Sequence, residues 1–284
     1  MSGRSSILRL VMLLLLCVAL SGCSALKLAY DNADTYLIWR ADRYLALRGP
    51  QHALLTRAVR QTLAWHRQQA LPIYATLADE AAMRLARGLK PADIDWAYTA
   101  VQTQWQDTLQ RAAQEVAPLL DTIDADQLVV LEKRFAEDNR TFAKDFGLNR
   151  PEAQRRKLRV ERNAERLSDW LGSLTDEQRA RIQAYSAQAP LDGAGRDRER
   201  QRLQQAFLRL LRERQAQAKL VEWVSDWSIG REPEFERQRL ENWMAYQRLL
   251  LELDALLSPA QRDYAVQRLR DYAQDFRTLA AARS

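Results

Sequence analysis

The stretch Leu174-Thr175-Asp176-Glu177-Gln178 contains the signal that decides the fold of this 284-residue chain. An apolar residue precedes a side chain that can cap a helix, and a glutamine follows three residues after the cap. In such a capping box the cap side chain accepts a hydrogen bond from the third helical amide, and the glutamine bonds back to the cap amide. The same order recurs at residues 123–127 and 257–261, and residues 47–51 form a degenerate copy without a capping side chain. These stretches predict helix starts of one kind.

The segments between these starts have helical periodicity. After Pro91, apolar side chains recur every three to five residues, which places them on one face of a helix: Trp96, Val101, Trp105, Leu109, Ala112 and Val116. Glycine and proline are few and fall at segment edges, and runs typical of strands are absent from the sequence. We therefore predict an all-α fold, a bundle of about nine or ten helices in two antiparallel sub-bundles.

Proline and glycine set the predicted boundaries. Pro72 is expected to end or kink a helix over residues 51–70. One long helix is predicted over residues 197–228, before Gly230. The most loop-like stretch of the body is residues 190–195, Pro-Leu-Asp-Gly-Ala-Gly, and we predict a loop and a candidate subdomain boundary there.

The N-terminus contains a second distinctive stretch, Leu20-Ser21-Gly22-Cys23. Arg4 and Arg9 precede an apolar run over residues 10–20, which is shorter than the roughly 20 residues that span a bilayer. The stretch resembles the lipobox of bacterial lipoproteins, whose signal peptide is cleaved before a cysteine that becomes acylated. An ordinary secretory signal and an uncleaved transmembrane helix are the alternatives.

The lipobox resemblance implies a domain plan. Residues 1–22 are the signal peptide, residues 23–30 the lipidated Cys23 and a tether, and residues 31–284 an all-helical periplasmic domain. Two or more acyl chains make membrane anchoring stable. By resemblance to sorted Gram-negative lipoproteins, Ser24 favours the outer membrane. The expected partners are therefore the membrane, through the lipid, and an envelope protein.

The cysteine content and the net charge restrict the kinds of stabilising bond and partner that we expect. The only cysteines are Cys17 and Cys23, so no disulfide is expected in the mature body. The formal charge of +6 falls to +4 once Arg4 and Arg9 leave with the signal. This mild basic excess favours anionic lipid headgroups or peptidoglycan carboxylates. Nucleic acid is not expected as a partner, because of the envelope address.

Residues suited to catalysis are sparse. The only histidines, His52 and His66, lie nearly four helical turns apart, so no metal, cofactor or cysteine–histidine pair is expected. Acidic side chains do cluster, at Asp121, Asp124 and Asp126 and again at Glu137-Asp138. A carboxylate pair can hydrolyse a glycan, but helix starts also favour negative charge. We therefore predict no catalytic residues and no enzyme.

Two arginine-rich stretches are present, Arg155-Arg156-Lys157 with Arg159, Arg162 and Arg166, and Arg196, Arg198, Arg200 and Arg202. We interpret them as solvated helix faces with ion pairs to Glu161, Glu165 and Glu199. Contact with anionic lipid or a cell-wall polymer is the alternative.

Aromatic side chains are expected mainly in the core. Most of the eight tryptophans lie on apolar helix faces. Trp39 is expected to face inward from a short helix near the N-terminus, although that helix could instead lie on the bilayer. Trp223 and Trp227, four residues apart, form the candidate interaction patch, partly exposed and hydrophobic.

Two further resemblances concern the body. The pattern Leu28-Ala29-Tyr30-Asp31-Asn32-Ala33-Asp34, with Trp39, Asp42-Arg43-Tyr44 and Gln51, resembles an uncharacterised family of helical proteobacterial lipoproteins, classed as a domain of unknown function. That resemblance implies the anchor and the helical fold and brings no catalytic residues. The stretch at 174–178 also resembles the Leu-Thr-x-x-Gln signature of small periplasmic chaperones of the envelope-stress type.

The sequence thus favours a non-enzymatic, outer-membrane-anchored lipoprotein that serves as an interaction scaffold or chaperone-like accessory in envelope maintenance. A carboxylate-dependent cell-wall glycan hydrolase is one alternative, and a binder of lipid or another apolar ligand is the other.

Overall fold

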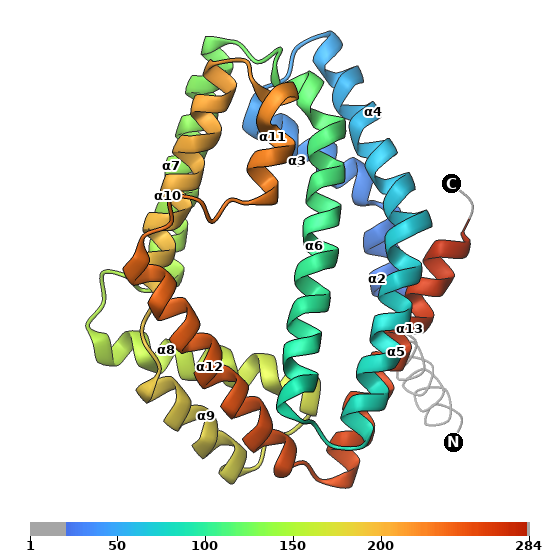
Figure 1. Cartoon of the computed structure of the whole chain (residues 1–284), viewed down its shortest axis with the longest axis vertical. Coiled ribbons are helices and arrows are strands. Elements are labelled where there is room, and N and C mark those ends of the chain that lie inside the picture. Colours follow the sequence, from blue (N-terminus) through green and yellow to red (C-terminus); the bar gives the residue numbers. More distant parts are fainter. Residues whose placement is uncertain (1–20, 283–284) are drawn as a thin grey trace, which may run out of the picture.

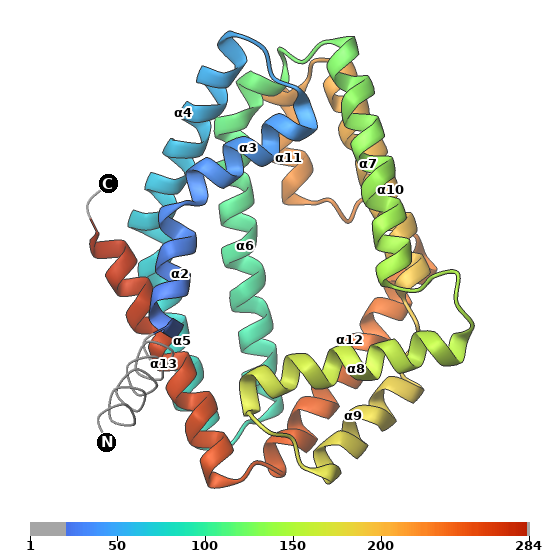
Figure 2. The same ribbon diagram turned by 180° about the vertical axis from the view of Figure 1, so that it is seen from behind.

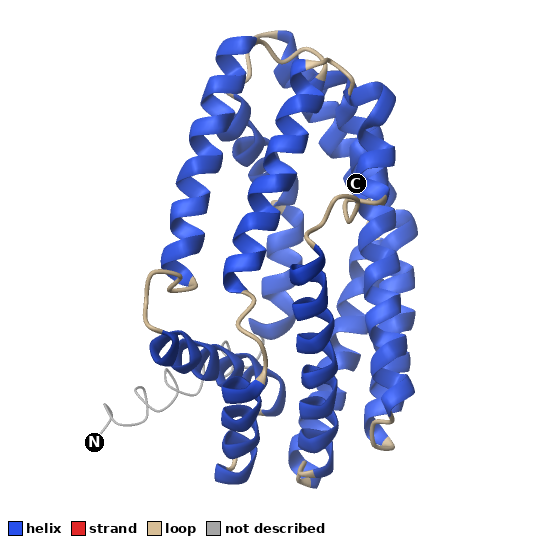
Figure 3. Ribbon diagram, turned by 60° about the vertical axis from the view of Figure 1, so that its left-hand side comes forward, coloured by secondary structure: helices blue, strands red, loops and turns tan. Residues whose placement is uncertain are grey.

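The computed structural model describes residues 21–282, apart from the side chains of residues 21–25. Within this range every regular element is a helix, so the predicted all-α class is confirmed (Figure 3). The described residues form eleven helices, slightly more than predicted, when α4, η1 and α5 are taken as one. Residues 1–20 of the predicted signal peptide lie outside the described residues, as does the side chain of Cys23.

The helices follow one another around an open frame (Figures 1 and 2). In chain order they are α2 (Ser21–Asp31), α3 (Ala33–Leu45), α4 (Pro50–Trp65), the π-helical segment η1 (His66–Ala70), α5 (Leu71–Ala86), α6 (Pro91–Leu120), α7 (Ala125–Asp145), α8 (Glu152–Leu171), α9 (Asp176–Gln188), α10 (Gly193–Arg212), α11 (Ala216–Ser225), α12 (Pro233–Ala255) and α13 (Pro259–Ala281). The long helix α6 runs beside α4, α7 pairs with α10, and α8, α9 and α12 lie at one end.

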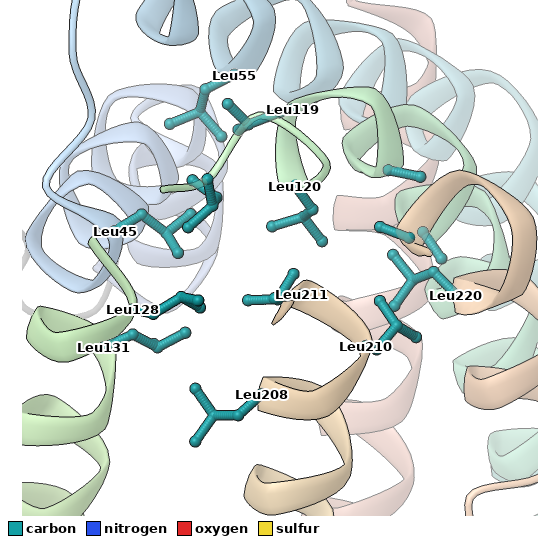
Figure 4. Packing of buried hydrophobic residues seen from close by; sticks show 14 of the residues in the cluster. Leu45, Leu55, Leu119, Leu120, Leu128, Leu131, Leu208, Leu210, Leu211 and Leu220 are labelled. Atoms are coloured by element: carbon teal, nitrogen blue, oxygen red, sulfur yellow. The ribbon is translucent and has the colours of Figure 1, made fainter. Parts of the chain in front are cut away.

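Two separate buried clusters hold the frame. The larger joins α3, α4, α6, α7, α10 and α11, and Figure 4 shows its leucines pointing toward one another from these helices. The smaller, built from Leu167, Leu174, Ile182, Leu249 and Leu253, joins α8, α9 and α12. Each fully buried leucine contributes about 2 kcal/mol of transfer free energy, so both clusters stabilise the fold substantially.

Pro72 does not end the helix that precedes it. The helix is continuous from Pro50 to Ala86, and the five-residue π segment η1 lies immediately before Leu71. Proline lacks the amide hydrogen that an α-helix needs, and a π segment rearranges the hydrogen bonds around such a gap. The helix is not interrupted, but α4 and α5 are inclined to each other across this segment (Figures 1 and 2), in accord with the kink predicted at Pro72.

The single helix predicted over residues 197–228 is wrong, because the structure has two helices there and the first begins within residues 190–195, which were predicted as a loop. Helix α10 already begins at Gly193, and Gly195 packs so closely on Phe235 that an added Cβ would lie 2.5 Å from its ring. The helix then breaks at Arg214, which has a positive φ of 52°. Asp121 from the end of α6 caps the new helix α11, because its carboxylate accepts hydrogen bonds from the amides of Ala216 and Gln217, at 2.7 and 3.1 Å.

The N-terminal helices differ in part from expectation. Residues 23–30, predicted as a tether, are helical. In α3, Leu45 is buried and Ile38 packs against the larger cluster, as predicted, but Trp39 is 50% exposed. The inward position predicted for Trp39 is therefore wrong, because α3 packs on one side only. None of the helices within residues 21–282 is long and apolar enough to cross a membrane.

Candidate functional site

The recurring helix-start signal forms true capping boxes. Asp124, Thr175 and Ser258 each accept a hydrogen bond from the amide three residues on, and the glutamine there bonds back to the cap amide. In the degenerate copy, the Gln51 side chain still accepts a hydrogen bond from the Arg48 amide, at 2.9 Å. The predicted local structure is thus confirmed at all three full copies.

The four glutamines also meet in pairs, which the sequence did not predict. The first glutamine clasp joins Gln51 to Gln127, and the second joins Gln178 to Gln261, with amide-to-amide hydrogen bonds of 2.8–3.1 Å. Each glutamine also donates to a backbone carbonyl two residues before the cap position of its partner's five-residue motif: Thr122, Ala46, Leu256 and Ser173. The clasps tie distant helix starts together at opposite ends of the frame (Figure 1).

An arginine-lined cavity of about 310 Å³ lies between α8 and α12. On α8, four arginines at spacings of 4, 3 and 4 share one face: Arg155, Arg159, Arg162 and Arg166. This arginine stripe adjoins the apolar face of α8, which packs into the smaller core through Leu167. Anchoring one face therefore fixes the direction of the other, and the stripe lines the cavity together with Arg196 and Arg239.

Arg159 is held by neutral oxygen atoms. Its guanidinium donates to the backbone carbonyls of Ala189 and Pro190 at 3.0 and 2.7 Å, and to the hydroxyl of Tyr185 at 3.2 Å. It also donates to Asn242 Oδ1 at 2.6 Å. The positive charge of Arg159 is therefore not neutralised by these contacts, and they tie the link between α9 and α10 to α8.

Asn242 is the most informative residue of the cavity. Its side chain comes from α12 and is only 7% exposed. Because its Oδ1 accepts from Arg159, its amide nitrogen must point away from that arginine, and this Nδ2 atom is buried without a hydrogen-bond partner. Arg155 Nε is likewise buried and unpartnered. Buried donors without partners are rare in folded proteins, so these two atoms make the cavity a candidate site for a hydrogen-bond acceptor.

The electrostatics of the cavity point in the same direction. Burial lowers the pKa of the Arg162 guanidinium below its ordinary value, and neighbouring positive charges lower it further, those of Arg166, Arg159 and Arg196. Among the described residues that line the cavity, Asp192 is the one carboxylate, and it pairs with Arg196 at 2.7 Å. The interior thus holds an excess of positive charge that an anion would relieve.

Aromatic rings also line the cavity. Tyr98 of α6 and Trp243 of α12 lie with their ring centroids 4.4 Å apart, and Tyr185 and Tyr246 lie 5.7 Å apart. Burial raises the pKa of the Tyr246 hydroxyl, which therefore remains a neutral donor at ordinary pH. The cavity thus combines charged donors with flat, amphipathic rings, and Arg159 lies over the Tyr185 ring, 5.0 Å from its centroid.

The acidic clusters singled out in the sequence have structural partners. Asp121 caps α11, and Asp124 caps α7 while pairing with Arg48 at 2.9 Å. Glu137 pairs with Arg134, and Asp138 accepts a 2.5 Å hydrogen bond from the Tyr44 hydroxyl. Among residues 21–282, no group of three or more His, Cys, Asp or Glu side chains could hold a metal ion.

The candidate patch of Trp223 and Trp227 is divided. Trp223 stacks on Phe207 against the larger core, whereas Trp227 follows the end of α11 and lines a separate groove with α6. The prediction that most tryptophans lie in the core is wrong, since none of the eight is fully buried and Trp105 is 56% exposed. Their rings are too large to fit between helices that pair only along narrow seams.

The sequence contained a signal for the cavity. The spacing of the α8 arginines was visible, but the stripe was interpreted as a solvated face with ion pairs to Glu161 and Glu165. Of the predicted pairs, the structure has the one between Arg202 and Glu199, at 2.8 Å. Arg159 bonds instead to neutral groups of α9, α12 and the link between α9 and α10. Asn242 gave no signal, because its role depends on contacts 83 residues away.

Comparison with known proteins places the chain in a family. A model of the family of unknown function DUF6279 matches residues 43–229. The chain belongs to this family. The match begins within α3 and ends just after α11, so it includes the first glutamine clasp and the arginine stripe of α8. No curated protein and no solved structure matches the chain.

Proposed function

We propose that this chain is a lipoprotein of the bacterial envelope, anchored at the outer membrane through Cys23, whose helical body is a non-enzymatic scaffold that binds an anionic ligand. One observation supports the ligand above all. The buried amide nitrogen Nδ2 of Asn242 has no partner, and its side chain contacts Arg159, which is held by neutral groups.

An anion would satisfy these groups together. Its oxygen atoms would accept from Asn242 Nδ2 and from the guanidinium of Arg155 or Arg162, and guanidinium groups match phosphate and carboxylate geometry well. Each hydrogen bond to a charged group contributes about 1.5–3 kcal/mol.

Binding of inorganic phosphate tests the ligand. The full chain is titrated with phosphate at constant ionic strength, alongside Arg159→Gln and the matched variant Arg237→Gln. Arg237 lies on α12 outside the cavity, and its side chain is 68% exposed. We expect binding to wild type and to Arg237→Gln, and at least tenfold weaker binding to Arg159→Gln. Equal affinity of all three proteins would contradict the proposal.

Metabolic labelling tests the anchor. The proposal rests here on Leu20-Ser21-Gly22-Cys23. Cells that express the full chain are supplied with labelled palmitate, and their membranes are separated. We expect label in wild type, recovered with the outer membrane, and none in Cys23→Ser. Label that persists in Cys23→Ser would disprove attachment at this cysteine.

An envelope protein partner completes the proposal. Crosslinking of the anchored chain in intact cells should recover one recurring envelope protein, as expected of a scaffold. Recovery of many unrelated unfolded proteins would favour the chaperone-like form of the same role. A chain that captures no envelope protein above background would contradict both forms.

A further inference from the structure

Two further grooves lie along α6, next to the arginine-lined cavity. It shares Tyr98 and Arg239 with a groove of about 700 Å³ between α6, α12 and the segment after α11. That groove shares Val101 and Trp105 with a third, of about 370 Å³, between α5, α6 and α13. Neighbouring hollows thus share lining side chains, three of them from α6 and Arg239 from α12.

The shared residues form an apolar stripe on α6. Tyr98, Val101 and Trp105 lie at i, i+3 and i+7, which places them on one face over about 10 Å of helix. All three are exposed, Val101 by 69% and Trp105 by 56%. A contiguous row of large exposed apolar side chains is unusual on the surface of a soluble protein and is typical of a binding site for an apolar ligand or partner.

The third groove differs sharply from the arginine-lined cavity in chemistry. Its lining is almost wholly apolar and includes Leu77, Ala81, Trp96, Leu269 and Phe276. The Tyr74 hydroxyl, one of the few polar groups there, is already bonded to Thr108, at 3.2 Å. A ligand in this groove would therefore gain from burying hydrocarbon and would find few hydrogen-bond partners.

We propose that the grooves together bind an anionic amphiphile with a single alkyl chain. Its phosphate or carboxylate headgroup lies in the arginine-lined cavity, and its chain lies along Tyr98, Val101 and Trp105 toward the apolar groove. This inference rests on the anion site proposed above. Charge complementarity selects the headgroup, and the continuous apolar stripe selects the chain. A small hydrophilic anion would leave the apolar stripe of α6 uncovered, and a neutral hydrocarbon would leave the arginine stripe of α8 without an anionic partner.

A series of alkyl phosphates tests the inference. The full chain in phosphatidylcholine nanodiscs is titrated by calorimetry with inorganic phosphate, butyl phosphate and octyl phosphate, and empty nanodiscs provide the blank. Burial of about two of the four additional methylene groups corresponds to roughly tenfold tighter binding. We therefore expect octyl phosphate to bind about tenfold tighter than butyl phosphate.

The same series separates two kinds of failure. If octyl and butyl phosphate bind equally, the amphiphile inference is overturned and the anion site stands. If no phosphate binds at all, the proposed anion site itself fails. Octyl glucoside, with the same chain and no charge, is expected to bind at least tenfold weaker than octyl phosphate, and equal binding would also overturn the inference.

Substitutions on α6 test where the alkyl chain of the ligand binds. The double variant Val101→Gln with Trp105→Gln changes exposed positions, and Val129→Gln on α7, 66% exposed and outside the grooves, is the matched control. We expect the double variant to lose the preference for octyl over butyl phosphate and to keep its affinity for butyl phosphate. Identical preferences in the double variant and the control would overturn the inference. Octanoate in place of octyl phosphate separates a fatty-acid source from a phosphate-headed lipid.

Discussion

The glutamine clasps and the arginine-lined cavity both bury polar side chains, and they do so in opposite ways. In the second glutamine clasp, the amide of Gln178 is fully buried and each of its atoms has a partner. In the cavity, Asn242 Nδ2 and Arg155 Nε have none. A hydrogen-bond network in which every group has a partner stabilises the fold by itself. A network with unpartnered donors can still bind an acceptor from a ligand. The difference separates a structural site from a candidate binding site.

The largest expected effect is on the clasps. Gln178→Ala should lower the free energy of unfolding by about 3 kcal/mol, because it removes a fully buried side chain that bonds to the Thr175 amide, to the Leu256 carbonyl and to Gln261. Urea unfolding of the full chain measures this. Gln183→Ala, at an exposed position on the same helix, is the control and should change stability by less than about 0.5 kcal/mol. Equal midpoints for the two variants would show that the clasp does not hold the fold.

The next effect concerns the cavity. Phosphate at one hundred times its dissociation constant should raise the free energy of unfolding by about 2.7 kcal/mol, because it binds only the folded state. Gln178→Ala should keep this increment, since separated sites act additively. Thermal unfolding with and without phosphate measures both. An increment that disappears in Gln178→Ala would mean that the clasp and the cavity are not independent.

A smaller effect on stability is expected from substitutions at the cap positions of the two glutamine clasps. Ser258→Ala should cost about 1 kcal/mol, the usual contribution of a helix cap, while the glutamine pair remains. Arg48 occupies the corresponding position in the first glutamine clasp and has no capping side chain, so Arg48→Ala should cost less than about 0.5 kcal/mol. Chemical unfolding gives both values. A larger loss for Arg48→Ala would show that its exposed ion pair with Asp124 matters more than the cap.

The smallest expected effect is the change in the free energy of unfolding when a cavity arginine is replaced in the absence of ligand. Arg162→Gln removes a charge that is desolvated and repelled by its neighbours, so stability in phosphate-free buffer should change by less than about 0.5 kcal/mol. The same variant should lose much of the phosphate-induced stabilisation. A strongly destabilised Arg162→Gln would place this arginine among the structural residues, with the clasps.

The sequence predicted the helices better than their partners. Capping boxes are local, so the helix starts at Asp124, Thr175 and Ser258 could be identified from five residues each. The clasps could not, because Gln51 and Gln127 are 76 residues apart. The break at Arg214 depends on Asp121 in the same way. Local patterns fix where helices begin, and long-range contacts decide which of them meet.

The candidate site was predictable only in part. The spacing of the α8 arginines was evident, but which face they occupy depends on packing of Leu167 in a core that the sequence does not define. Asn242 and Tyr98 looked like ordinary helical residues. Their importance appears only where α6, α8 and α12 come together around the cavity.

A crystal structure of the full chain with selenate, an anion whose selenium can be located by anomalous scattering, tests the central claim most directly. We predict selenate in the arginine-lined cavity, within hydrogen-bond distance of Asn242 Nδ2 and of Arg155 or Arg162. Selenate bound only at exposed arginines such as Arg237, with the cavity empty, would contradict the account.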